Sequence, residues 1–164
     1  MRKTCLVLLA WVLVAAFAPS DLSGAADPAG GDGVVVLVNA HNEISLDEDE
    51  TKRLLRRLYL KERSSWPDGE RAVFFARASA DVAERRFRRE ILDMTDASLD
   101  DHWIRQKQTR GETPPRAVRS TRILMRQIER RPNAVGVVTK SEFDELSGTH
   151  ENVRILISLH GDAR

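Results

Sequence analysis

Short apolar runs rich in β-branched residues alternate along this chain with segments of helical periodicity. The clearest run, Val34-Val35-Val36-Leu37-Val38, is apolar at every position, which is typical of a strand covered on both faces of a sheet. Further strands are predicted over 71–75, 134–139 and 153–159. Strands that alternate with helices pack as layers, so the pattern favours one α/β domain over an all-α bundle.

The segments between these strands have helix starts and apolar faces. In the helix predicted over 47–60, the acidic residues Asp47 to Glu50 complement the positive end of the helix dipole. In the helix predicted over 81–91, Asp81-Val82-Ala83-Glu84 has the form of a capping box, and Phe87 and Ile91 continue one apolar face. Further helices are predicted over 98–104, 120–130 and 141–146, with a loop over 108–119.

The N-terminus has the layout of a secretory signal peptide. Arg2 and Lys3 precede an apolar run from Cys5 to Ala18, and small residues follow over 23–26. The run is shorter than the roughly 20 residues that a membrane-spanning helix needs, so an uncleaved anchor is the weaker alternative. We predict a signal peptide over 1–25, a flexible lead-in over 26–33 and a folded domain over 34–164, in a periplasmic or secreted protein.

Cysteine usage and charge exclude several further classes. Cys5 is the only cysteine and lies in the signal segment, so the exported chain is expected to have no disulfide, no catalytic thiol and no lipid anchor. The sequence holds 26 Lys and Arg against 25 Asp and Glu, and removal of residues 1–25 leaves the chain formally neutral. This balance argues against nucleic acid as a partner, because nucleic-acid binding needs a net basic face.

The arginines around Phe87 are the one stretch that resembles a nucleic-acid stripe. Glu84 and Glu90 are interleaved with them, and a helix with Phe87 inward would turn these arginines to solvent. We therefore predict a solvated helix face, with a contact to a partner protein as the alternative. The arginines concerned are Arg85, Arg86, Arg88 and Arg89.

No spacing of catalytic or metal-ligating residues stands out. The histidines lack the His-Glu-x-x-His pattern and have no cysteine partners, so no metal site is expected. The chain has no Gly-x-Ser-x-Gly elbow and no Gly-x-x-x-x-Gly-Lys-Ser/Thr loop. We predict no enzymatic activity, no catalytic residue and no cofactor; a hydrolase assembled from residues distant in sequence is the alternative. Trp66 and Trp103 are predicted to be packing residues.

A series of short segments, in order, resembles the phosphate-type periplasmic substrate-binding proteins. They are Val36-Leu37-Val38-Asn39, Arg57-Leu58-Tyr59-Leu60, Trp66-Pro67-Asp68-Gly69, Phe87, Trp103, Gly111-Glu112-Thr113-Pro114-Pro115 and Ala134-Val135-Gly136-Val137. The resemblance implies a type 2 periplasmic-binding-protein-like fold with a mixed sheet flanked by helices. Since the chain is long enough for about one lobe, it resembles the short, single-domain members.

The same resemblance implies a ligand site. The family's phosphate loop, at a helix N-terminus, matches Arg77-Ala78-Ser79-Ala80-Asp81, where Arg77 and Ser79 keep hydrogen-bond donors. The glycines of the family pattern are absent, and Asp81 would repel a phosphate. The implied binding residues are Asn39, Arg77, Ser79, Arg110, Gly111 and Thr113.

Two functions are expected from this resemblance. The first is weak binding of phosphate or another small anion, in partnership with an ABC transporter or a membrane sensor. The second is a ligand-free interaction protein of the periplasm that kept the fold and lost the site, because fold does not determine function.

Overall fold

A computed structural model describes residues 32–159, so the predicted signal peptide, most of the lead-in and residues 160–164 lie outside the described residues. The strands are β1 (Val34–Asn39), β2 (Val73–Ala76), β3 (Arg116–Ala117), β4 (Ala134–Thr139) and β5 (Val153–Leu159). The helices are α1 (Glu48–Tyr59), α2 (Val82–Phe87), the π-helical turn η1 (Arg88–Leu92), α3 (Asp96–Arg110), α4 (Thr121–Glu129) and α5 (Lys140–Ser147).

The strands form one mixed sheet in the order β3-β2-β4-β1-β5. β2 pairs in parallel with β3 and β4, whereas β1 pairs antiparallel with β4 and β5. The carboxyl ends of β2 and β4 therefore lie at one edge of the sheet, and the carboxyl end of β1 lies at the opposite edge. This difference in direction decides which of the predicted site residues can meet.

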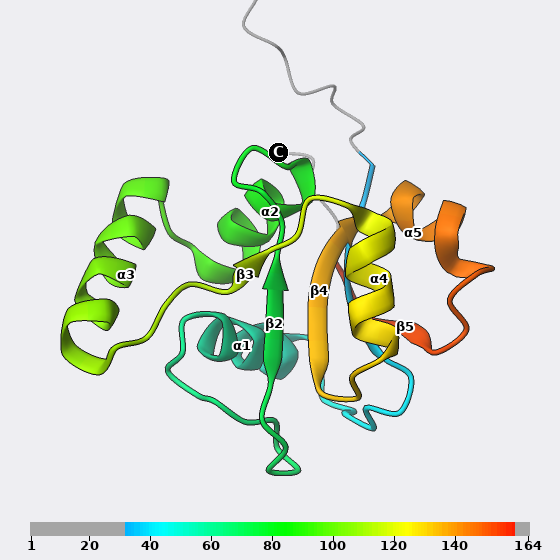
Figure 1. The fold of residues 1–164 in the computed structure, drawn as a ribbon, viewed down its shortest axis with the longest axis horizontal. Coiled ribbons are helices and arrows are strands. Elements are labelled where there is room, and N and C mark those ends of the chain that lie inside the picture. Colours follow the sequence, from blue (N-terminus) through cyan, green and yellow to red (C-terminus); the bar gives the residue numbers. More distant parts are fainter. Residues whose placement is uncertain (1–31, 160–164) are drawn as a thin grey trace, which may run out of the picture.

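Helices cover both faces of the sheet, and each face has its own apolar core. The first core lies beneath α1, α2, η1 and α3, and the second lies beneath α4 and α5. Figure 1 shows α1 and α2 on one side of β4 and α4 on the other. Along β1, Val36 faces the first core and Leu37 the second, and both side chains are fully buried. The unbroken apolar run in the sequence follows from this double coverage.

α4 lies close to the sheet because β4 carries a glycine beneath it. A Cβ added to Gly136 would lie 2.8 Å from Leu124 Cδ1 and 3.2 Å from Ile128 Cδ1. Both of these side chains are fully buried and have little room to move. The absence of a side chain at this position therefore sets the distance between α4 and β4.

The secondary-structure prediction was wrong in three places. The predicted helix over 81–91 is α-helical only to Phe87 and continues as the wider turn η1. α3 extends to Arg110, beyond the predicted end at 104. The prediction missed this extension because the second half of α3 is polar and carries no apolar periodicity. Residues 116–117, predicted as loop, form the edge strand β3 through pairing with β2, a contact that no local pattern shows. Trp66 and Trp103 are buried, as predicted.

Candidate functional site

Arg77 occupies the carboxyl edge of the parallel strands, directly after β2. Its Nη2 lies 2.8 Å from Asp81 Oδ2 in an ion pair and donates to Glu142 Oε1 at 3.0 Å, and its Nε donates to Asp81 Oδ2 at 3.0 Å. The side chain is only 5% exposed. Its remaining nitrogen, Nη1, is buried without a hydrogen-bond partner among the described residues. The guanidinium is thus held between two carboxylates of its own chain.

Glu142 joins three elements at this edge. Its Oε1 also accepts from the Thr121 hydroxyl at 2.5 Å, at the start of α4, and its Oε2 accepts from Thr139 N at 3.0 Å. In return, the Glu142 amide donates to the Thr139 hydroxyl oxygen, which completes a capping box at the start of α5. The run Thr139-Lys140-Ser141-Glu142 has the sequence signature of this motif, so the signal was present in the sequence and was missed.

The helix starts at this edge are capped by side chains of the protein. Asp81 is the N-cap of α2, and its Oδ1 accepts from Ala83 N at 3.0 Å. At α5, the exposed carboxylate of Asp32 accepts from the amide and the hydroxyl of Ser141. These caps place carboxylates at the ends of helices where a bound anion would be favoured by the dipole.

Glu84 forms a second, fully buried layer beneath Arg77. Its Oε1 accepts from the Tyr59 hydroxyl at 2.7 Å, and its Oε2 accepts from Arg77 N at 2.8 Å. Burial raises the pKa of the Glu84 carboxyl, and the hydrogen bond from Arg77 N acts in the opposite direction. The predicted capping box was therefore half right: Asp81 caps α2, but Glu84 turns inward instead of reaching back to the helix start.

Arg88 corrects the prediction that the arginines around Phe87 all face solvent. Its side chain is 8% exposed, and its Nη1 donates to Asp96 Oδ1 at 2.6 Å. Its Nη2 donates to Ser79 O at 2.9 Å, and its Nε lies 3.6 Å from Glu84 Oε1. Arg88 lies one helical turn after the buried Glu84, whereas Arg85 and Arg89 are exposed. Regular i,i+4 spacing therefore places Arg88 on the same inward face as Glu84.

The structure does not bring all of the implied ligand residues together. Asn39 lies at the opposite edge, where its Nδ2 donates to the carbonyls of Ile128 and Glu129 and closes the end of α4. Arg110 ends α3, and Gly111 caps it with a φ of 69° in the left-handed region. Within residues 32–159, no hydrogen bond or ion pair joins the segment 110–113 to Arg77.

Ser79 is exposed, and it meets Arg88 through its carbonyl. Thr113 is exposed in the loop between α3 and β3. The polar cluster at the carboxyl ends of β2 and β4 therefore consists of Arg77 together with carboxylate and hydroxyl groups that the family resemblance did not imply. The residues that sequence reasoning missed as parts of this cluster are Tyr59, Glu84, Arg88, Thr121, Thr139 and Glu142.

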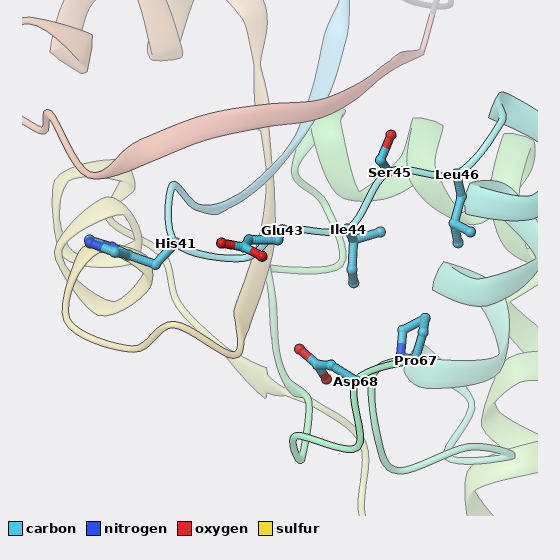
Figure 2. Close-up of a pocket in the computed structure, with 7 residues that line it drawn as sticks. All are labelled: His41, Glu43, Ile44, Ser45, Leu46, Pro67 and Asp68. Carbon is cyan, nitrogen blue, oxygen red and sulfur yellow. The ribbon is translucent and has the colours of Figure 1, made fainter.

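A groove of about 330 Å³ lies at the opposite edge of the sheet, between the β1–α1 loop and the turn before β2. Figure 2 shows the carboxylates of Glu43 and Asp68 directed toward the same space, with Ile44, Leu46 and Pro67 on its other side. None of the implied ligand residues lines this groove. Its acidic lining is unfavourable for an anion.

Between residues 32 and 159, no cluster of three or more His, Cys, Asp or Glu side chains is arranged to hold a metal ion. In the same part of the chain, no helix combines the length and the apolar character needed to cross a membrane.

Solved structures with this fold are known. The chain is similar to an ABC-type phosphate transport receptor from Vibrio cholerae, with a TM-score of 0.50, 15% identity and coverage of 81% of this chain and 58% of the receptor. It is similar to PstS from Borrelia burgdorferi, with a TM-score of 0.55, 14% identity and coverage of 76% and 46%. It is also similar to a putative phosphate ABC transporter substrate-binding protein with bound phosphate from Clostridium perfringens, with a TM-score of 0.50, 12% identity and coverage of 80% and 56%.

These similarities concern the fold alone. The chain spans about half the length of the solved structures that it matches. The predicted fold, one lobe of a substrate-binding protein with an open mixed sheet flanked by helices, is confirmed. No protein-family model and no curated protein matches the sequence.

Proposed function

We propose that this chain is an exported interaction protein with the fold of a substrate-binding lobe, and that it works without a small-anion ligand. One observation carries the proposal: the guanidinium of Arg77, the cation of the expected anion site, is bonded to Asp81 and Glu142 of the same chain. The signal-like segment over 1–25 supports export and a periplasmic or secreted location.

The physical argument is a competition between anions. A phosphate that reached Arg77 would have to displace carboxylates that are covalently tethered beside it. It would also be repelled by two negative charges that face a single guanidinium. Breaking a buried ion pair leaves an uncompensated charge, which is strongly unfavourable. Arg77 therefore acts here as a structural cation that ties α2 and α5 to the end of β2.

One observation favours the other expected function, weak anion binding at Arg77. Arg77 Nη1 is buried and lacks a hydrogen-bond partner among the described residues, so one donor of this guanidinium remains for a ligand. Arg77 and Ser79 would then bind phosphate or another small anion and deliver it to an ABC transporter or a membrane sensor. The segment 110–113 and Asn39 would need to move to complete the implied set.

Titration calorimetry with phosphate separates these two functions. We expect no heat from the wild-type protein at phosphate concentrations up to about 1 mM, the weak end of specific binding. The double variant Asp81→Asn/Glu142→Gln keeps the side-chain shapes, removes the competing charges and should gain weak phosphate binding. The matched control Asp144→Asn/Glu145→Gln removes the same charge from exposed positions of α5 and should gain none.

The opposite pattern would establish the anion-binding function. Binding by the wild-type protein that is lost in Arg77→Gln, with no gain in the double variant, would show that Arg77 is available to a ligand. Sulfate and short carboxylates, titrated in the same way, would define the anion class.

We also propose that the protein is not an enzyme. Support comes from the sequence, which has no Gly-x-Ser-x-Gly elbow and no His-Glu-x-x-His spacing. The purified protein should therefore show no turnover of ester, phosphoester, glycoside or peptide substrates. Turnover that disappears in a variant of Ser79 or His102 would contradict this.

A further inference from the structure

The outward side of α4 is a row of arginines. Its inward residues Leu124 and Ile128 are fully buried in the second core. Arg122, Arg126 and Arg130 recur every fourth residue on the exposed side, which spaces them about 6 Å apart along the helix axis. Figure 1 shows α4 on the side of the sheet that α1, α2 and α3 leave open.

Neighbouring arginines extend this row into a basic surface. Arg116 and Arg119 lie in the segment that leads into α4, and both are exposed. Arg131 follows α4, and its guanidinium lies 5.5 Å from the centroid of the Phe75 ring. We call this surface the α4 face: Arg116, Arg119, Arg122, Arg126, Arg130 and Arg131.

The arginines of the α4 face have no acidic partner in the described part of the chain. The ion pairs between residues 32 and 159 involve other basic residues, among them Arg77, Arg86 and Arg88. The chain as a whole is close to neutral, so this local excess of positive charge is balanced elsewhere on the molecule. A local excess of positive charge of this kind attracts a partner of opposite charge.

An apolar groove lies within the α4 face. It has a volume of about 280 Å³ and runs between β3 and α4. Phe75, Val118 and Ile123 form its apolar walls, and Arg116 and Arg119 line it as well. Ile123 is 51% exposed, which is unusual for a large apolar residue on a helix whose other apolar residues are buried. The groove therefore offers apolar surface next to unpaired positive charge.

We propose that the α4 face docks an acidic segment of a partner protein, which places one apolar side chain in the groove. The proposal rests on the proposed function, since it names the kind of partner that an interaction protein with this surface would bind. Carboxylates of the segment pair with the arginine row, and guanidinium groups suit such pairing because of their planar, bidentate geometry. The apolar side chain adds the specificity that charge alone does not give.

The shape of the surface favours a protein segment over a lipid bilayer or a nucleic acid. A flat bilayer surface would contact the arginine row but would leave the concave groove unfilled. A nucleic acid would use the phosphate-binding capacity of the arginines, yet its phosphates provide nothing apolar for Phe75 and Ile123. An acidic peptide with one large apolar residue satisfies both features of the face.

The test uses a fluorescein-labelled peptide in which one leucine lies between runs of glutamate. Its binding to the purified protein is measured by fluorescence anisotropy at about 50 mM and about 300 mM salt, since salt screens exposed charges. A second peptide replaces the leucine with serine. We expect the serine peptide to bind about fivefold more weakly, because it leaves the groove unfilled.

Paired variants locate the binding. Arg122→Glu/Arg126→Glu should weaken binding of the leucine peptide by about tenfold or more. The control Arg85→Glu/Arg89→Glu changes the net charge equally at exposed positions on the other side of the sheet and should change binding less than about twofold. Ile123→Ser should remove the preference for leucine while leaving the affinity for the serine peptide unchanged.

Several results would overturn the proposal. Equal losses of peptide affinity in the two double-arginine variants would indicate unspecific charge attraction. Equal affinities for the leucine and serine peptides would show that the groove is not used. Binding to phosphatidylglycerol vesicles that depends on Arg122 and Arg126, without peptide binding, would assign the face to membranes. Self-association lost in the same variant would assign it to a second copy. Failure of the proposed function would be detected by a separate measurement: titration calorimetry would show phosphate binding that depends on Arg77.

Discussion

Two groups of arginines in this molecule differ in their surroundings and therefore in their roles. Arg77 and Arg88 are nearly buried at the β2–α2 edge, and each is bonded to carboxylates of its own chain. The arginines of the α4 face are exposed and have no acidic partner within residues 32–159. The first group holds the fold together, and the second remains available to a partner. Residue type alone does not separate a structural cation from a binding one.

The difference is also the basis of the function proposed above. At the β2–α2 edge, Asp81 and Glu142 stand where an anion would be needed to neutralise Arg77. The fold thereby keeps the electrostatic balance that a bound ligand would provide. On α4, the positive charge has no such internal balance within residues 32–159. The following predictions, in order of decreasing effect, test this contrast.

The largest effect is expected from Arg88→Ala. This change removes the cation nearest to Glu84 and the bonds to Asp96 and Ser79 O, and it leaves a buried carboxyl less compensated. Removal of one partner of a buried pair costs about 3–5 kcal/mol of unfolding free energy. Urea denaturation followed by circular dichroism measures it. A cost below about 1 kcal/mol is typical of exposed charges and would contradict the structural role assigned to Arg88.

Gly136→Ala should have an intermediate effect. The new Cβ would lie within 2.8 Å of Leu124 Cδ1, so α4 must shift or a buried side chain must change rotamer. Overpacking of this kind costs about 1–3 kcal/mol. The same denaturation experiment measures the loss, and Gly148→Ala, whose added Cβ meets no atom within 4 Å, is the matched control. A stabilising result would show that α4 is not seated tightly on β4.

The free energy of unfolding should depend on pH through the titration of the buried Glu84 carboxyl. Burial raises the pKa of Glu84 in the folded state, so the folded protein binds this proton more tightly than the unfolded chain does. The resulting stabilisation is fully present below about pH 4.3, the usual Glu pKa, and is lost as the pH rises through the folded-state pKa. The difference in unfolding free energy between wild type and Glu84→Gln should therefore decrease with rising pH. A constant difference would contradict the raised pKa.

The smallest effect is expected from Arg122→Ala. An exposed arginine without an acidic partner contributes little to the fold, so the unfolding free energy should change by no more than about 0.5 kcal/mol. Thermal unfolding of this variant beside Arg88→Ala gives the most direct comparison of the two arginine groups. A large loss from Arg122→Ala would show that the α4 face is part of the structural framework.

The sequence was informative wherever structure follows from local pattern. The apolar run over 34–38 and the helices over 47–60 and 120–130 are predicted from periodicity, and each matches an element of the structure. The helical pattern also placed Ile123 inside with Leu124 and Ile128, and this was wrong, because Ile123 is exposed. Periodicity failed where polar residues form a helix, as in the second half of α3, and where pairing with a distant strand creates β3. Neither feature leaves a local apolar signal.

The candidate site was predictable only in part. Arg77 was named through the family resemblance, which matches it to a phosphate loop at a helix N-terminus. Glu142 is the residue that neutralises it, yet it lies 65 positions away in the sequence. The capping-box pattern at Thr139 was visible, but nothing local indicated that its glutamate also meets Arg77. The implied role of Asn39 depended on the direction of β1, which the sequence does not specify.

By itself, the sequence determined the alternation of strands and helices, the two-sided burial of β1 and the signal-like N-terminus, because these follow from side-chain polarity and spacing along the chain. The tertiary structure alone decided which arginines are buried and paired and which are exposed. Ion pairing depends on distances through space, and those distances are set by strand order and strand direction. β1 runs against β2, so Asn39 and Arg77 lie at opposite edges of the sheet, and a shared site could not be inferred from their residue types.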